Sequence, residues 1–224
     1  MTGDAFVPME ILTNTGGVAM TNAFLVADET SGQAVLFDAP DHTVEPLLKA
    51  ATARGWTLAG LWLTHGHFDH FADHEIVRRH FPAAQVLIHA LDEAKAADPA
   101  RQLRMFGLSF EIPPLKADGR VVAGQRLKIG SLEVEVIHTP GHSPGHVAYH
   151  FPKEGVLVGG DLIIGGSIGR TDLPDSDYGA LEKSVQAVMK LPDPTRLLGG
   201  HGPVSTVGAE RRNNPFVREI LEHT

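Results

Sequence analysis

The chain of 224 residues is 42% hydrophobic and 21% charged, a balance that allows one domain to bury a sizeable core. Its formal net charge of -8 disfavours nucleic acid as a partner, and no apolar stretch approaches the ~20 residues that a membrane span needs. Cysteine is absent, which excludes disulfides, a thiolate nucleophile and cysteine-bound zinc, so any metal ligand must be His, Asp or Glu. The start of the chain lacks the basic and apolar regions of a signal peptide. We therefore expect a cytoplasmic protein with one domain over residues 1–224 and with neither nucleic acid nor a membrane as partner.

In the first half of the chain, short apolar runs alternate with helical patterns. Residues 18–27 and 33–38 predict a hairpin, and the apolar spacing from Val44 to Ala51 predicts a helix that ends near Gly55. A strand over 57–64 follows, then a helix to about Phe81, a strand over 85–89 and a short helix over 90–97. Residues 100–117 contain two adjacent prolines and predict an irregular loop over a site.

The second half repeats this order of elements. Strands are predicted over 125–129, 132–139, 146–151 and 155–160. A helix then places Tyr178, Leu181, Val185, Val188 and Met189 on one face, which favours core packing for Tyr178, and a strand over 195–199 and one or two short helices from Ala209 end the chain. Locally paired strands and helices in two comparable halves suggest two sheets face to face with helices outside.

The most informative segment follows the predicted strand at 57–64. It reads His65-Gly66-His67-Phe68-Asp69-His70, three imidazoles and a carboxylate within six residues. These are the ligands that zinc or iron takes when no thiolate is offered. Alternate side chains of an extended segment share a face, so we expect His65 and His67 to bind one ion together. Asp69 and His70 come where the chain turns, and could hold a second ion nearby.

Three further polar residues follow predicted apolar strands. His142, Asp161 and His201 each lie just past a strand end, next to Gly or Pro residues that let the backbone turn. Assigning His65, His67 and His142 to one ion, and Asp69, His70 and His201 to the other, leaves Asp161 free to bridge the two. Each ion then has three terminal ligands, a shared carboxylate and room for a bridging water.

The order H-x-H-x-D-H, then His, Asp and His, resembles the metallo-β-lactamase superfamily over nearly the whole chain. The resemblance implies an α/β fold, an αββα sandwich of two mixed sheets with outer helices and metals at one edge. It also implies that Thr64 and Asp38 support the site; alternatively, Thr64 is an ordinary strand residue and Asp38 a turn former. Two divalent ions are expected, with zinc favoured and iron or manganese as alternatives, because the His-rich set suits all three.

Two segments are similar to short, single-domain type II glyoxalases. They are the run from Gly160 to Pro174, which contains Gly-Arg-Thr-Asp-Leu-Pro, and Gly200-His201-Gly202-Pro203 with the region after Arg211-Arg212. The resemblance implies a small thioester substrate, a hydroxyacylglutathione. The main rival is a mononuclear-iron persulfide dioxygenase, which would use His65, His142 and Asp161 as iron ligands. Another hydrolase of the same fold, with lactonase or weak β-lactamase activity, is a further alternative. A metal-binding module without enzymatic activity is an alternative from another class of protein.

The chemistry that this site predicts is hydrolysis by a metal-bridging hydroxide. A metal pair lowers the pKa of a bridging water to about 7, and Asp69 is expected to orient that nucleophile and take its proton. Arg170 either contacts a substrate carboxylate or pairs with a nearby acid such as Asp172. The pair Arg211-Arg212 favours a solvated helix face, the role of His74 is left open, and the sequence does not indicate an oligomeric state.

Overall fold

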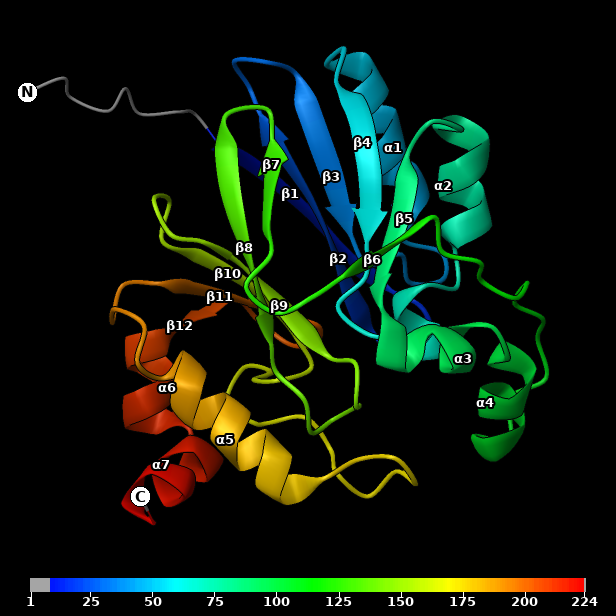
Figure 1. Ribbon diagram of the computed structural model, residues 1–224. Coiled ribbons are helices and arrows are strands. Elements are labelled where there is room, and N and C mark those ends of the chain that lie inside the picture. Colours follow the sequence, from blue (N-terminus) through cyan, green and yellow to red (C-terminus); the bar gives the residue numbers. More distant parts are fainter. Residues whose placement is uncertain (1–8, 224) are drawn as a thin grey trace, which may run out of the picture.

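A computed structural model describes residues 9–223 of the protein. Two six-stranded sheets pack face to face, and helices cover both outer faces (Figure 1). The strands of the first sheet are β1 Met9–Gly16, β2 Thr21–Asp28, β3 Gln33–Phe37, β4 Thr57–Trp62, β5 Gln85–His89 and β6 Gly119–Val121. Those of the second sheet are β7 Arg126–Ile129, β8 Leu132–His138, β9 Val147–Phe151, β10 Val156–Gly160, β11 Arg196–Gly199 and β12 Ser205–Thr206. The helices are α1 Val44–Ala53, α2 His74–His80, α3 Glu93–Ala96, α4 Pro99–Met105, α5 Tyr178–Val188, α6 Val207–Asn213 and α7 Pro215–Glu222, with short 3-10 turns η1 Phe68–His70 and η2 Ala90–Asp92.

Both sheets are mixed. The first has the order β1-β2-β3-β4-β5-β6, antiparallel up to β3 and parallel from β3 to β6. The second has the order β12-β11-β10-β9-β8-β7, in which only β10 and β11 are parallel. The predicted αββα sandwich of two mixed sheets is therefore confirmed.

Alternation along β2 explains how one strand contributes to two cores. Phe24 and Val26 face the second sheet, whereas the alternate residues Ala23, Leu25 and Ala27 face the outer helices, and all are buried. Between the sheets the ring centroid of Phe37 lies 5.0 Å from that of Tyr149. Each fully buried side chain of this size contributes about 1.5–3 kcal/mol. Apolar packing between the sheets, under the helices on the first sheet, and under the helices on the second sheet therefore stabilises the sandwich.

Hydrogen bonds join the two sheets at the edge where several strands end. The Tyr149 hydroxyl donates to the Leu63 carbonyl over 2.9 Å, and the Val147 amide donates to the Thr64 carbonyl over 2.8 Å. The Asn22 amide donates to the Gly200 carbonyl over 2.7 Å. The loops after β4, β8, β10 and β11 are thereby brought to one place.

Some elements differ from the sequence prediction. Strand β1 was not predicted because its MEILTNTG sequence is mostly polar, and it lies at the edge of the sheet. The predicted loop over 100–117 is wrong at its start, because α4 begins at Pro99 and Asp98 caps it by accepting the Arg101 amide over 3.1 Å. Tyr178 is not in the core: it is 45% exposed at the start of α5. Among residues 9–223, we find no helix with the length and apolar character needed to cross a membrane.

Candidate metal centre

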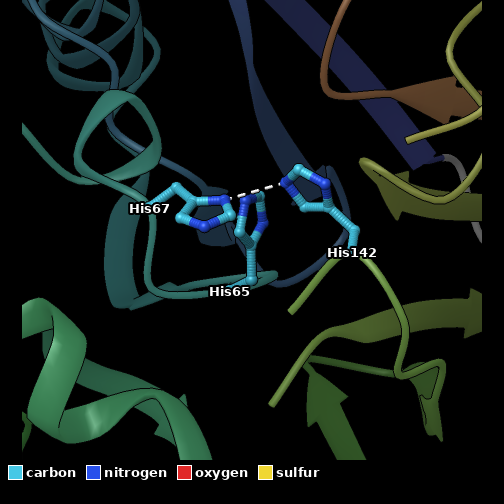
Figure 2. Close-up of side chains that lie close together, drawn as sticks. All are labelled: His65, His67 and His142. Carbon is cyan, nitrogen blue, oxygen red and sulfur yellow. Dashed lines mark hydrogen bonds between the residues drawn. The ribbon is translucent and has the colours of Figure 1, made fainter. Parts of the chain in front are cut away.

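The first group of ligand candidates comprises His65, His67 and His142. All three are buried, and one ring nitrogen from each lies within 4.8 Å of those of the other two. Figure 2 shows the three rings turned toward one another, with the dashed line marking 2.8 Å between His67 Nδ1 and His142 Nε2. His65 and His67 lie beyond the end of β4 and His142 beyond β8, so each sheet supplies part of the group.

The second group comprises Asp69, His70 and His201. Asp69 Oδ2 lies 3.5 Å from His70 Nε2 and 3.5 Å from His201 Nε2. Asp69 and His70 lie in the turn η1 and His201 follows β11, so both sheets again contribute. Burial alone would lower the pKa of His70, but Asp69, Asp161 and Asp38 raise it well above its usual value.

Asp161 lies between the two groups. Its Oδ2 is 3.5 Å from His142 Nε2 of the first group and 3.2 Å from His201 Nε2 of the second, and its Oδ1 is 3.4 Å from His70 Nε2. Burial alone would raise the pKa of Asp161, but His70, His201 and His142 hold it well below its usual value. An ionised carboxylate therefore faces both groups at once.

The donor set fits divalent metal ions. Six buried side-chain polar atoms in the described part of the chain lack a hydrogen bond, and three of them are His65 Nε2, His70 Nε2 and Asp161 Oδ1. Buried polar atoms are nearly always paired, so three unpaired ligand atoms in one cluster favour a cation. Burial lowers the pKa of His65 and of His67 well below the usual value, which keeps these imidazoles in the neutral form that binds metal. Nitrogen and oxygen donors without thiolate suit zinc, iron or manganese.

Asp38 and Thr64, the two residues that the family resemblance pointed to, contact the back of this cluster. Asp38 Oδ1 accepts the Thr64 amide, and its Oδ2 accepts the Thr64 hydroxyl and His70 Nδ1–H, each over 2.8 Å. Thr64 Oγ1 lies 3.0 Å from His65 Nδ1, and because its own proton goes to Asp38 it accepts a hydrogen bond from His65 Nδ1–H. These contacts leave Nε2 of His65 and of His70 directed at the cluster.

Asp92 also contacts the site and was missed by the sequence analysis. It is buried, and its Oδ2 accepts the Gly66 amide over 2.8 Å and the Ser143 hydroxyl over 2.6 Å, while its Oδ1 accepts the Gly145 amide over 2.8 Å. One carboxylate thus joins the loop of His65 and His67 to the loop of His142. A Cβ at Gly66 or at Gly145 would lie 2.7 Å from atoms of Asp92, so both positions require glycine.

Two more buried residues position the carboxylates. The Thr21 hydroxyl donates to Asp69 Oδ2 over 2.8 Å. His146 Nε2 accepts the Asp161 amide over 3.0 Å, and its Nδ1–H donates to Thr139 Oγ1 over 2.8 Å. Burial lowers the pKa of His146 to about 3, so it remains a neutral acceptor. Neither contact follows from the sequence, since both depend on which strands become neighbours.

The other basic candidates are paired. Arg170 Nε and Nη2 donate to the Asp172 carboxylate over 2.6 and 2.8 Å, in the ion pair that was one of its two predicted roles. Arg211 and Arg212 both pair with Asp193. Of the groups of potential ligands found in residues 9–223, none includes His74, which is buried and donates to the Phe71 carbonyl over 3.0 Å.

A cleft of about 380 Å³ opens over the cluster. Its lining includes Asp69, Asp161, Arg170 and Phe106. Two of the ligand candidates, Asp69 and Asp161, therefore face the same space as the Arg170 guanidinium. The Arg170 guanidinium also lies 5.9 Å from the centroid of the Phe106 ring. Its Nη1 is not used by Asp172, which leaves a donor for another acceptor.

Lys95 contacts the outer side of His67. Its Nζ is 3.1 Å from His67 Nε2 and 2.6 Å from Asp175 Oδ2. Ligation through His67 Nδ1 would leave the ring proton on Nε2. A ring N–H and an ammonium group are both donors and cannot hydrogen-bond each other. The carboxylate of Asp175 would then be the hydrogen-bond partner of Lys95.

Two facing mixed sheets with His and Asp clusters at one edge define a metal-dependent class of protein. The family model described as "Metallo-beta-lactamase superfamily" matches residues 16–201, and the chain belongs to this superfamily, as its motifs indicated. The crystal structure of the BLEG-1 B3 metallo-beta-lactamase is 35% identical, with a TM-score of 0.85, and the match covers 93% of this chain and 99% of that one. The structure of TTHA1623 in a di-iron-bound form is 38% identical, with a TM-score of 0.81 and coverage of 92% and 99%. The hydroxyacylglutathione hydrolase GloC of Haemophilus influenzae is 31% identical over 197 residues, 88% of this chain and 92% of that protein.

Proposed function

We propose that the chain, as a single metallo-β-lactamase-like domain over residues 1–224, is a cytoplasmic dinuclear metallohydrolase that cleaves thioesters of the hydroxyacylglutathione class. The observation that carries the proposal is the pair of ligand groups joined by Asp161, whose two oxygens face both groups within 3.2–3.5 Å. The similarity to a hydroxyacylglutathione hydrolase supports the substrate class, and the di-iron form of TTHA1623 supports a pair of ions.

In this proposal each group would hold one divalent ion, and Asp161 would be the carboxylate that the two ions share. His65, His67 and His142 would hold one ion, and Asp69, His70 and His201 would hold the other. Zinc is our first choice, with iron or manganese as alternatives, because the donors are nitrogen and oxygen only. When bound, the pair supplies Lewis acidity toward a carbonyl oxygen and lowers the pKa of water to about 7.

Asp69 is the residue that we assign to proton handling. Its carboxylate lines the cleft, and the Thr21 hydroxyl holds Oδ2 in place over 2.8 Å. A carboxylate in that position orients an attacking water and accepts its proton. The departing group needs no general acid, because a thiolate is a good leaving group without prior protonation.

Arg170 is the residue that we assign to the substrate. It lines the same cleft, and its free Nη1 is suited to a carboxylate of the thiol part, while Asp172 keeps the guanidinium in place. Phe106 and Leu108 supply apolar surface around it, which strengthens a charge-assisted hydrogen bond by excluding water.

The proposal is tested with protein reconstituted separately with zinc, iron and manganese. S-D-lactoylglutathione should be hydrolysed, with free thiol and acid appearing in equal amounts and with about two ions per chain. Oxygen uptake with glutathione persulfide, without thioester cleavage, would assign the protein to the dioxygenase alternative. Cleavage of a lactone or a β-lactam without thioester cleavage would move it to another hydrolase class.

A further inference from the structure

A second cleft, of about 440 Å³, opens beside His67. It lies between α3, α4 and the segment of residues 173–175, and it shares His67 and Leu173 with the cleft over the cluster. Since His67 Nδ1 faces the ligand group, the two clefts adjoin the reaction centre proposed above. Such a volume is within the range of small-molecule sites.

The walls of this second cleft are largely apolar. Leu91 and Met105 line it with 60% and 51% of their surfaces exposed, and Leu173 and Pro174 form the opposite wall. Exposed side chains of this size are not explained by core packing. Apolar side chains gathered around a cleft beside a reaction centre indicate a ligand that covers them.

The charges in this cleft cancel. Lys95 pairs with Asp175 over 2.6 Å, and Asp98 and Arg101, on successive turns, add one negative and one positive charge. An ionic group would therefore meet both signs, so a neutral group fits this cleft better. The arrangement differs from the first cleft, where Arg170 offers Nη1 to a carboxylate.

A thioester has two arms that diverge from its reacting carbonyl carbon. If the thiol arm lies in the first cleft against Arg170, the second cleft is left for the acyl arm. A lactoyl group has five non-hydrogen atoms, and even if each took the volume of a water molecule in the liquid, about 30 Å³, the group would fill only about a third of the 440 Å³. We propose that the second cleft is the acyl subsite, and that it favours neutral, apolar acyl groups longer than lactoyl, with kcat/KM rising along the series up to hexanoyl. This inference rests on the proposed thioester hydrolysis.

The experiment compares S-acylglutathiones with propanoyl, butanoyl, pentanoyl and hexanoyl groups, together with lactoyl and the charged glutaryl group. With the metal-loaded enzyme, kcat/KM should rise about threefold to fourfold for each methylene added. Pentanoyl should exceed glutaryl, which has the same chain length but a terminal carboxylate.

Two variants locate the effect. Leu91→Gln and Met105→Gln should each lower the hexanoyl-to-propanoyl ratio by about threefold or more, because they replace an apolar wall with an amide. The matched control is Phe216→Gln on α7, which removes an exposed apolar side chain outside both clefts and should leave the ratio unchanged. A flat chain-length series, a preference for glutaryl, or a ratio retained in both cleft variants would overturn the inference.

Calorimetry with S-hexyl and S-propylglutathione, thioethers that cannot be hydrolysed, separates this inference from the proposed function. Tighter binding of the hexyl compound, lost in Met105→Gln, supports the subsite whatever the reaction is. Hydrolysis of lactoylglutathione combined with equal binding of the two thioethers would remove the acyl subsite and leave the proposed function intact.

Discussion

Replacing Asp92 with Asn would test whether one carboxylate sets the distance between the two loops of the first ligand group. Asp92 accepts three hydrogen bonds, from the Gly66 amide, the Ser143 hydroxyl and the Gly145 amide. An amide side chain replaces one acceptor oxygen with an NH₂ donor, so at least one buried backbone N–H loses its partner in either orientation. A lost hydrogen bond to a charged group costs about 1.5–3 kcal/mol, and we expect the free energy of unfolding of the metal-free protein to fall by that amount.

The effect on metal binding should be confined to one of the two groups. Gly66 lies between His65 and His67, and Ser143 follows His142, so all the contacts of Asp92 are in loops of the first group. We expect the affinity for the ion in that group to fall about tenfold to a hundredfold, while the group of Asp69, His70 and His201 keeps its affinity.

A chelator competition titration of the cobalt-substituted protein, followed by its visible absorption, measures the two binding steps separately. Ser143→Ala is the matched control, since it removes one of the three hydrogen bonds and leaves both backbone amides paired. It should show a smaller loss in the same binding step. Asp92→Asn could instead destabilise the metal-free protein while leaving both metal-binding steps unchanged, or while weakening both equally. Either result would mean that Asp92 stabilises the fold without setting the geometry of the first ligand group, and our reasoning would be wrong.

Three further perturbations address the bridging residue, the substrate contact and the fold. Asp161→Ala should weaken both ions and abolish activity, whereas His201→Ala should weaken mainly one; metal analysis that finds two ions per chain in Asp161→Ala would contradict the bridging assignment. Arg170→Met should lower kcat/KM for glutathione thioesters about tenfold with unchanged metal content, because a charge-assisted hydrogen bond is lost; an equal loss on a small thioester without a carboxylate would instead make Arg170 structural. Burial alone would raise the pKa of Asp28, but hydrogen bonds led by those from Ser131 lower it to about 2 from 3.8. Since the folded-state pKa is lowered, Asp28 contributes about 2 kcal/mol above pH 4 that is lost as the pH falls toward 2, so the difference in free energy of unfolding between the protein and Asp28→Asn should shrink over that window. A difference that stayed constant from pH 6 to pH 2.5 in denaturant titrations would contradict this account.

The ligand candidates can be predicted from the sequence because each stands beside a pattern that folds locally. Apolar runs before His65, Asp161 and His201 predict strands, and these strands are β4, β10 and β11. Because β10 and β11 are parallel neighbours, their ends bring Asp161 and His201 together, whereas His65 reaches them only through the packing of the first sheet on the second. The structure adds the distances and shows that Asp161 faces both groups.

The residues behind the ligands cannot be predicted in the same way. Thr21, His146 and Asp92 contact the site only because particular strands and loops become neighbours. Such contacts carry no local pattern, since a buried polar side chain and a loop residue look alike in one sequence. The helix α4 was also missed, although Asp98 followed by Pro99 is a helix-start signal, because its seven residues are too few for a clear apolar repeat.

Two glycines in the loops that carry the ligand candidates show what the sequence predicts and what only the structure adds. Gly66 belongs to the ligand motif between His65 and His67, and Gly145 closes the Gly-x-Ser-x-Gly pattern around Ser143. The structure gives both the same cause, since a Cβ at either position would lie 2.7 Å from an atom of Asp92. A glycine pattern therefore indicates that something approaches the backbone closely, but only the folded chain identifies the approaching group. Here Asp92 is the approaching residue, through its backbone oxygen at Gly66 and its carboxylate at Gly145, and that carboxylate hydrogen-bonds both loops, so the ligand motif depends on a residue outside it.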